Sequence, residues 1–160
     1  MGHASPFEFS PEYMPAPHMR QFLAGTPPVL SMSVLDAALD VYRDIDIHRA
    51  REKALNLADY YAARVLECPA LGSLDLISPL THPQRGAQLA FSHADAYAIS
   101  QALISVGVIA DFRAPDILRL GFSPLFLTFR DMDQAVQKLE HVMAQKLYRQ
   151  PQFSRRHSVT

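Results

Sequence analysis

The hydrophobic pattern changes along the chain from helical spacing to strand spacing and back. Apolar residues recur every three or four positions in four segments, which predicts a helix in each of them. These helices span about residues 33–42, 46–68, 95–106 and 131–148. The side chains that can cap their N-termini are Ser31 or Ser33 for the first, Asp44 or Asp46 for the second, and Asp131 or Asp133 for the last.

Four shorter apolar segments lie between turn-forming residues and predict strands. They are residues 74–77, 88–91, 108–112 and 117–122. Gly107 is placed to end the third helix, and Ala114-Pro115-Asp116 predicts the turn between the last two strands. The order helix, helix, strand, strand, helix, strand, strand, helix predicts an α+β fold, with about four strands and helices packed on one face.

Residues 1–32 lack this periodicity and predict an extended arm. Six of the 12 prolines lie in this segment, and they exclude long helices there. Its aromatic residues include Phe7, Phe9, Tyr13 and Phe22. Because disordered segments are poor in aromatic residues, we expect the arm to lie against a surface. The α+β domain then covers residues 33–148, and residues 149–160 form a disordered basic tail.

The composition excludes several classes of function. The 15 basic and 16 acidic residues give a net charge of -1, so nothing favours binding to nucleic acid. No apolar run approaches the roughly 20 residues that a membrane span needs, and the first residues do not form a signal peptide. Cys68 is the one cysteine and fits a buried structural thiol. A chain with one cysteine has no internal disulfide, which fits a cytoplasmic location.

Arg119 is the strongest candidate for a binding residue. In a strand, Leu118, Leu120 and Phe122 share the face that packs on the core, so Arg119 points to the opposite face. Gly121 leaves space beside it for a ligand or another backbone. A guanidinium group binds a carboxylate through two parallel hydrogen bonds, so this pattern predicts a site for a small carboxylate. The alternative is an ordinary arginine on a half-exposed strand.

A second arginine, Arg113, precedes the predicted turn between the last two strands. Its position favours a structural role, in which the guanidinium group anchors the turn. The candidate partners are Asp111 and Asp116.

The segment Gly25-Thr26-Pro27-Pro28 is a rigid element that could bind a phosphate. The prolines fix the backbone, while Gly25 permits an unusual φ beside the Thr26 hydroxyl group. Backbone and hydroxyl donors held in this way suit a phosphate. The alternative is a plain turn before the next helix.

Motifs for metal binding or for catalysis do not stand out. The seven histidines are scattered, and none forms an H-x-H or H-x-x-x-H pair, so we expect no metal site. The sequence contains no P-loop, no G-x-G-x-x-G and no Ser-His-Asp order. The carboxylates of Asp40, Asp44 and Asp46 fit a solvated junction between helices. We therefore assign no catalytic residue to this chain.

Several short blocks follow one another in a fixed order between residue 2 and about residue 143. They are Gly2-His3, Pro6-Phe7-Glu8-Phe9, Tyr13, Pro15-Ala16, Arg20, Phe22-Leu23, Gly25-Thr26-Pro27-Pro28, Arg85-Gly86, Gly107-Val108-Ile109-Ala110-Asp111-Phe112-Arg113, Asp116-Ile117-Leu118-Arg119 and Pro124-Leu125. Together these blocks resemble the central-to-C-terminal part of bacterial kynureninases. The resemblance is specific because many blocks agree at once.

The resemblance implies the small C-terminal domain of a pyridoxal 5'-phosphate (PLP) enzyme of the fold-type I aminotransferase superfamily, which acts as a homodimer. Such enzymes hydrolyse L-kynurenine, and also 3-hydroxykynurenine, in tryptophan degradation. By this resemblance, Arg119 binds the substrate α-carboxylate and His3 lines the pocket for the substrate ring. Thr26, beside Gly25, reaches the cofactor phosphate across the dimer interface.

The chain also departs from the family pattern. The lysine that holds PLP, the aspartate to its pyridine nitrogen and the main phosphate loop lie upstream of the matched blocks, and a tryptophan is expected just before Gly2. The lysines of this chain are Lys53, Lys138 and Lys146, on outer helix faces or at a helix end. We therefore expect Met1 to be an internal methionine of a longer frame, and residues 1–32 to belong on a missing PLP domain.

On that expectation the chain alone is inactive. Two other interpretations remain at the level of sequence. One is a free-standing α+β module that binds a small molecule or a protein through the Arg119 face. The other is a decayed gene product without a function.

Overall fold

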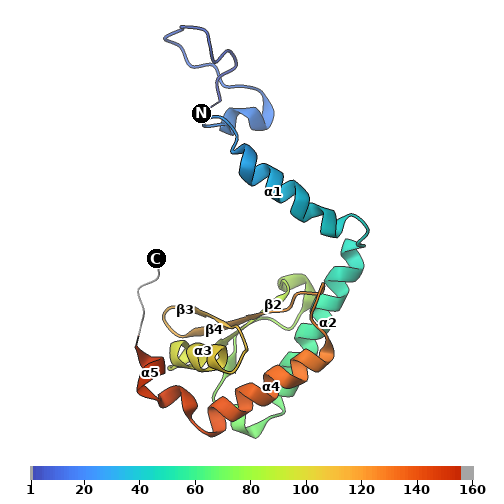
Figure 1. Ribbon diagram of the computed structural model, residues 1–160, viewed down its shortest axis with the longest axis vertical. Coiled ribbons are helices and arrows are strands. Elements are labelled where there is room, and N and C mark those ends of the chain that lie inside the picture. The colour runs from blue at the N-terminus through green and yellow to red at the C-terminus, as the bar shows by residue number, and fades with distance from the viewer. Residues whose placement is uncertain (1, 156–160) are drawn as a thin grey trace. The chain divides into compact units, whose positions relative to one another are not determined.

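The computed structural model describes residues 2–155. By its internal contacts the chain divides into two compact units, residues 1–45 and residues 46–160, which we call the N-terminal unit and the C-terminal unit. Figure 1 shows the elements of both units. We expected the first helix to belong to the α+β domain, whereas its contacts place it in the N-terminal unit.

The N-terminal unit begins with a segment that folds back on itself. The backbone N–H of Gly2 donates to the carbonyl of Gln21 at 2.9 Å, and that of Ala4 donates to Met14 at 2.8 Å. His3 and Pro15 form an isolated antiparallel bridge. The arm therefore has an irregular conformation at these residues, in which backbone groups pair with one another.

Three helical segments follow in this unit: the 3₁₀ helix η1 (His18–Phe22), the α-helix α1 (Val29–Leu39) and the 3₁₀ helix η2 (Asp40–Tyr42). Helix α1 begins before either predicted cap. The Ser33 hydroxyl donates back to the Val29 carbonyl at 2.9 Å and lies inside the helix. Pro28 stands at the N-cap position with φ -73°, which suits the start of a helix because proline fixes φ near that value.

The C-terminal unit has the predicted α+β architecture. Its regular elements are α2 (Ile47–Leu66), β1 (Asp75–Leu76), β2 (Gln88–Ser92), α3 (Ala96–Ser105), β3 (Asp111–Arg113), β4 (Ile117–Gly121), α4 (Phe129–Ala144) and α5 (Pro151–Ser154), with the 3₁₀ helices η3 (Pro69–Leu71), η4 (His82–Gln84) and η5 (Leu147–Arg149). The four strands pair antiparallel in the order β1-β2-β4-β3.

Helix boundaries in this unit follow local capping chemistry. The Asp46 carboxylate accepts a hydrogen bond from the backbone N–H of His48 at 2.9 Å, so Asp46 is the cap of α2. Helix α4 starts earlier than predicted, because Thr128 is its cap and Asp131 occupies the third position of a capping box. Gly107 follows α3 with φ 82°, which confirms its predicted role at the end of that helix.

The core lies between the sheet and helices α2, α3 and α4. Strands β2 and β4 pair with Leu89 opposite Leu120 and Phe91 opposite Leu118, and all four side chains are buried. The helices contribute residues such as Tyr61, Ile99 and Leu139 to the same cluster. The residues between the buried ones on β4, Ile117 and Arg119, are half-buried on the other face. This alternation confirms the prediction that helices cover one face of the sheet.

The end of the chain is more ordered than predicted. Helices η5 and α5 contact α3, and Phe153 is half-buried against the core. The expected tail from residue 149 is thus helical as far as Ser154. Residues 156–160 lie outside the described part of the chain. Within that described part, no helix has the length and apolar character needed to cross a membrane.

Candidate carboxylate-binding site

Arg119 lies in the middle of β4, on the face of the sheet opposite the core, as predicted. Its side chain is 27% exposed, so the guanidinium group is partly shielded from water. A Cβ placed on Gly121 would have no atom within 4 Å, so the space beside Arg119 on this face is open. These two residues place a partly shielded cation beside open space, where a ligand could reach it.

Asp111 holds this guanidinium group. Strands β3 and β4 pair with Asp111 directly opposite Arg119. The Asp111 Oδ2 atom accepts a hydrogen bond from Nε of Arg119 at 3.0 Å and a second one from Nη2. Arg119 lowers the pKa of the Asp111 carboxyl below its ordinary value, because the hydrogen bonds and the positive charge favour the ionised form. The candidate site is therefore an arginine that already has one carboxylate partner.

Sequence reasoning missed this pair, although a signal for it exists. Asp111 and Arg119 are equally far from Pro115, the centre of the predicted turn. In an antiparallel hairpin, residues at equal distances from the turn lie opposite each other. The pairing could thus have been read from the spacing.

Arg113 lies in the same hairpin and shares the same carboxylate. Its Nε atom lies 3.5 Å from Oδ2 of Asp111, which is one of the two partners predicted for it. Asp116, the other predicted partner, instead accepts a hydrogen bond from the Ser92 hydroxyl at 2.7 Å. The Arg113 side chain is 65% exposed. It therefore adds positive charge at the rim of the site.

His3 is fixed within the folded arm. Its Nδ1 accepts a hydrogen bond from the Ser5 backbone N–H at 2.9 Å, and its Nε2 lies 3.2 Å from the carbonyl of Glu12. The ring packs edge-on against Tyr13. Because a carbonyl can only accept, Nε2 is the donor in the contact with Glu12, and the contacts hold the ring in one orientation.

Gly25 and Thr26 are both exposed, and a Cβ on Gly25 would contact nothing within 4 Å. Gly25 does not use the conformational freedom that glycine permits; among the described glycines, Gly107 is the one with a positive φ. Thr26 and the nearby backbone are thus open to solvent. His3, Gly25 and Thr26 belong to the N-terminal unit and Arg119 belongs to the C-terminal unit.

The three lysines differ in their surroundings. Lys53 Nζ donates to the Pro124 carbonyl at 2.7 Å, and Lys53 is half-buried where an outer face was expected. Lys138 is also half-buried and lines a cavity of about 750 Å³ with mostly apolar walls. Lys146 is exposed after α4 and has φ 52°. Lys53 is thus occupied by a backbone contact, and Lys146 stands outside any pocket described here.

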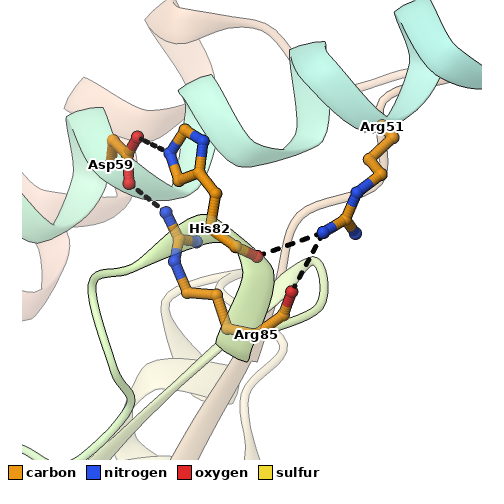
Figure 2. Close-up of polar contacts among 4 residues, drawn as sticks. All are labelled: Arg51, Asp59, His82 and Arg85. Atoms are coloured by element: carbon orange, nitrogen blue, oxygen red, sulfur yellow. Dashed lines mark hydrogen bonds and ion pairs between the residues drawn. The ribbon is translucent and has the colours of Figure 1, made fainter.

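A second polar cluster joins the segment between β1 and β2 to helix α2. The Arg85 side chain is only 2% exposed and donates to Oδ1 of Asp59 on α2. His82 Nε2 lies 2.5 Å from the other oxygen of Asp59, and Arg51 donates to the carbonyls of His82 and Arg85. Figure 2 shows the side chains of His82 and Arg85 pointing toward Asp59. The Arg85 guanidinium group therefore fixes this segment to the helix through Nη2, while its Nε and Nη1 atoms are buried without a hydrogen-bond partner among the described residues.

The similarity of this chain to known proteins agrees with the fold. Residues 50–139 match the family model of the kynureninase C-terminal domain. The chain is 46% identical over 143 residues to a kynureninase of Deinococcus radiodurans, covering 89% of this chain and 35% of that protein. It is 42% identical over 159 residues to kynureninases of Burkholderia mallei and Burkholderia pseudomallei, covering 99% of this chain and 38% of those proteins. The chain thus spans little more than a third of the length of these relatives.

Proposed function

The chain belongs to the kynureninase family and corresponds to the C-terminal domain of its members. We propose that it acts as part of an enzyme that hydrolyses L-kynurenine to anthranilate and L-alanine. The same enzyme would convert 3-hydroxykynurenine to 3-hydroxyanthranilate and L-alanine. The proposal includes a PLP cofactor, a homodimer and a cytoplasmic location. The observation that carries it is Arg119, a half-buried cation with open space beside it on a chain with this family resemblance. A non-enzymatic binding module is not favoured, since the chain matches kynureninases over most of its length.

Arg119 would bind the α-carboxylate of the substrate. In L-kynurenine the carboxylate is attached to Cα, and hydrolysis breaks the bond between Cβ and Cγ of the same short chain. A clamp on the carboxylate therefore also positions the bond to be broken. PLP, when bound, stabilises the negative charge that develops on the substrate during cleavage. The part that this chain performs is orientation, and a planar guanidinium group suits that task better than an ammonium group.

The residues of the N-terminal unit would act at the other end of the site. We propose that Thr26, with the backbone at Gly25, donates hydrogen bonds to the PLP phosphate of the partner subunit. The exposed hydroxyl of Thr26 and the open space at Gly25 support this assignment. His3 would line the pocket of the substrate ring, and its fixed orientation supports a role in shaping that pocket.

The lysine that binds PLP would come from the part of the enzyme that this chain does not span. The contact of Lys53 with Pro124 and the exposed position of Lys146 support this proposal for two of the three lysines, while Lys138 is half-buried and lines a cavity. We also propose that residues 1–32 lie on that PLP domain. It follows that the 160-residue chain with added PLP should not hydrolyse L-kynurenine.

We expect a chimera to be active. It would join the N-terminal part of the Deinococcus radiodurans kynureninase to this chain at the boundary of their alignment. The chimera should release anthranilate from L-kynurenine, and Arg119→Lys should raise KM by about tenfold or more, because lysine cannot form the two-bonded clamp. Anthranilate fluorescence provides the assay.

The matched control is Arg130→Lys, an exposed arginine on α4, which should leave KM unchanged. A chimera that is folded and loaded with PLP but does not cleave L-kynurenine would contradict the proposed function. An active chimera in which Arg119→Lys keeps the original KM would remove Arg119 from the site while leaving the function in place.

A further inference from the structure

The contact between Arg119 and Asp111 uses one particular edge of the guanidinium group. Both hydrogen bonds reach Oδ2 of Asp111, from Nε and from Nη2. A planar guanidinium group has a side edge, formed by Nε and one Nη, and an end edge, formed by the two Nη atoms. Asp111 therefore occupies the side edge of Arg119, and the end edge is directed away from Asp111.

We propose that Asp111 is a positioning residue, which holds the side edge of Arg119 so that the end edge receives the α-carboxylate of the substrate. This inference rests on the proposed function, and it adds which atoms of Arg119 bind the substrate and which residue orients them. In this arrangement Asp111 stays in place when the substrate arrives. The substrate carboxylate forms two parallel hydrogen bonds with Nη1 and Nη2.

The strand pairing supports a permanent role for Asp111. Asp111 and Arg119 lie directly opposite each other in the β3–β4 ladder, and Arg113 pairs with Ile117 on the turn side. Side chains opposite each other in an antiparallel pair start only about 4.5–5.5 Å apart at Cβ, so the contact needs no rearrangement of the backbone. The pairing of β3 with β4 therefore places the Asp111 carboxylate beside Arg119.

Positioning has a physical benefit for binding. An arginine side chain has many rotamers, and a ligand that must order it loses affinity. Asp111 removes that freedom in advance. The shared Oδ2 atom also lies 3.5 Å from Nε of Arg113, so the cluster contains two guanidinium groups and one carboxylate. One positive charge remains after this pairing, which favours a second carboxylate at the site.

Asp111→Asn in the chimeric enzyme tests the inference. Asparagine keeps the size of the side chain but removes its charge, so the hold on Arg119 weakens. We expect KM for L-kynurenine to rise about tenfold while kcat changes less than twofold, because a less ordered Arg119 binds the carboxylate more weakly but still clamps it once the substrate is bound. Asp75→Asn is the matched control, an exposed aspartate on β1 at the other edge of the sheet, and it should leave both constants unchanged.

Two inhibitors separate orientation from general damage. L-Alanine carries the α-carboxylate, whereas L-alaninamide has a neutral group in its place. Asp111→Asn should raise the Ki of L-alanine about tenfold and leave the Ki of L-alaninamide unchanged. Asp111→Glu retains the charge one methylene further out and should recover part of the lost affinity for L-alanine. Equal changes in both Ki values would show a merely structural effect and overturn the inference.

A measurement without substrate turnover examines the contact itself. In the ¹⁵N-labelled 160-residue chain, the Nε–H resonance of Arg119 should be resolved and slow to exchange with water, and Asp111→Asn should abolish that protection. An unprotected Nε–H in the unmodified chain would overturn the inference.

The outcomes also distinguish this inference from the proposed function. If Arg119→Lys raises KM and Asp111→Asn does not, the positioning role of Asp111 fails alone. If Arg119→Lys has no effect on KM, the assignment of Arg119 fails first.

Discussion

The hydroxyl group of Tyr61 is the least expected polar atom in the core. Tyr61 is 1% exposed and packs against Phe91 and Phe122, with ring centroids 6.4 and 5.4 Å away. Among residues 2–155, its hydroxyl has no hydrogen-bond partner. Burial raises the pKa of this phenol well above its ordinary value, so the group is neutral. Removing this hydroxyl from water destabilises the fold, because no hydrogen bond within the described part of the protein compensates for the loss.

Replacing Tyr61 with phenylalanine should therefore stabilise the protein. Tyr61→Phe removes the unpaired hydroxyl and keeps the ring, so we expect the free energy of unfolding to rise by about 1 kcal/mol. Urea unfolding followed by circular dichroism measures the change. Tyr60→Phe is the matched control, since the Tyr60 hydroxyl donates to Asp133 at 2.7 Å and its loss should not stabilise. A lower stability of Tyr61→Phe would show that the hydroxyl has a partner in solution.

At this scale the sequence predicts which face a residue occupies, and it does less well at naming the partners of that residue. The period of two in residues 117–122 places Arg119 on the face opposite the core, because successive side chains of a strand point to opposite faces. The partner of Arg85 is different. Arg85 lies in a segment without periodicity, and its contact with Asp59 spans 26 positions of the chain. Nothing local in the sequence encodes such a contact.

The capping box that begins α4 is the clearest example of an element defined by a few polar atoms. The Thr128 backbone N–H donates to Oδ2 of Asp131 at 2.7 Å, and the Thr128 hydroxyl donates to the same oxygen at 2.6 Å. These bonds lower the pKa of Asp131 below its ordinary value of 3.8. From the sequence we expected either Asp131 or Asp133 at the cap position, whereas Asp131 occupies the third position of the helix. The cap is Thr128, and it was not identified from the sequence because apolar residues lie on both sides of it.

The stabilising effect of this capping box should depend on pH. A carboxyl whose pKa is lowered on folding stabilises the fold above its unfolded pKa, and the effect is lost as the pH falls through the folded value. Asp131→Asn should therefore lower stability at pH 7 and change it much less at about pH 2. Thermal unfolding at both pH values tests this. Glu140→Gln, an exposed carboxylate further along α4, serves as the control. Equal losses at both pH values would contradict the assignment.

At the scale of the whole molecule, the two units differ in how much they bury. The C-terminal unit contains the buried cluster, whereas in the N-terminal unit Ala16 is the one buried apolar residue among those described. Helix α1 has no buried residue, although most of its side chains are apolar. A helix that is apolar on all sides normally lies inside a larger structure. The prolines and aromatic residues of the first 28 positions indicated that this unit lies against another surface. The hydrophobic pattern does not identify which structure that surface belongs to.

Limited proteolysis of the isolated chain should reveal this difference. With little core to protect them, residues 1–45 should be cut first, leaving a resistant fragment that begins near Asp46. Mass spectrometry of the digest identifies the cut sites. In the active chimera the same residues should be protected, because the PLP domain would cover them. Equal resistance of both units in the isolated chain would show that the N-terminal unit is stable by itself.

The pairing of β3 with β4 has a consequence for how this domain can change length. Successive residues of a strand point to opposite faces, so an insertion of one residue between Asp111 and the turn would move the Asp111 side chain to the other side of the sheet. Arg119 would keep its place but lose the carboxylate beside it. Single insertions or deletions between Asp111 and Arg119 would therefore separate the two side chains without altering either residue.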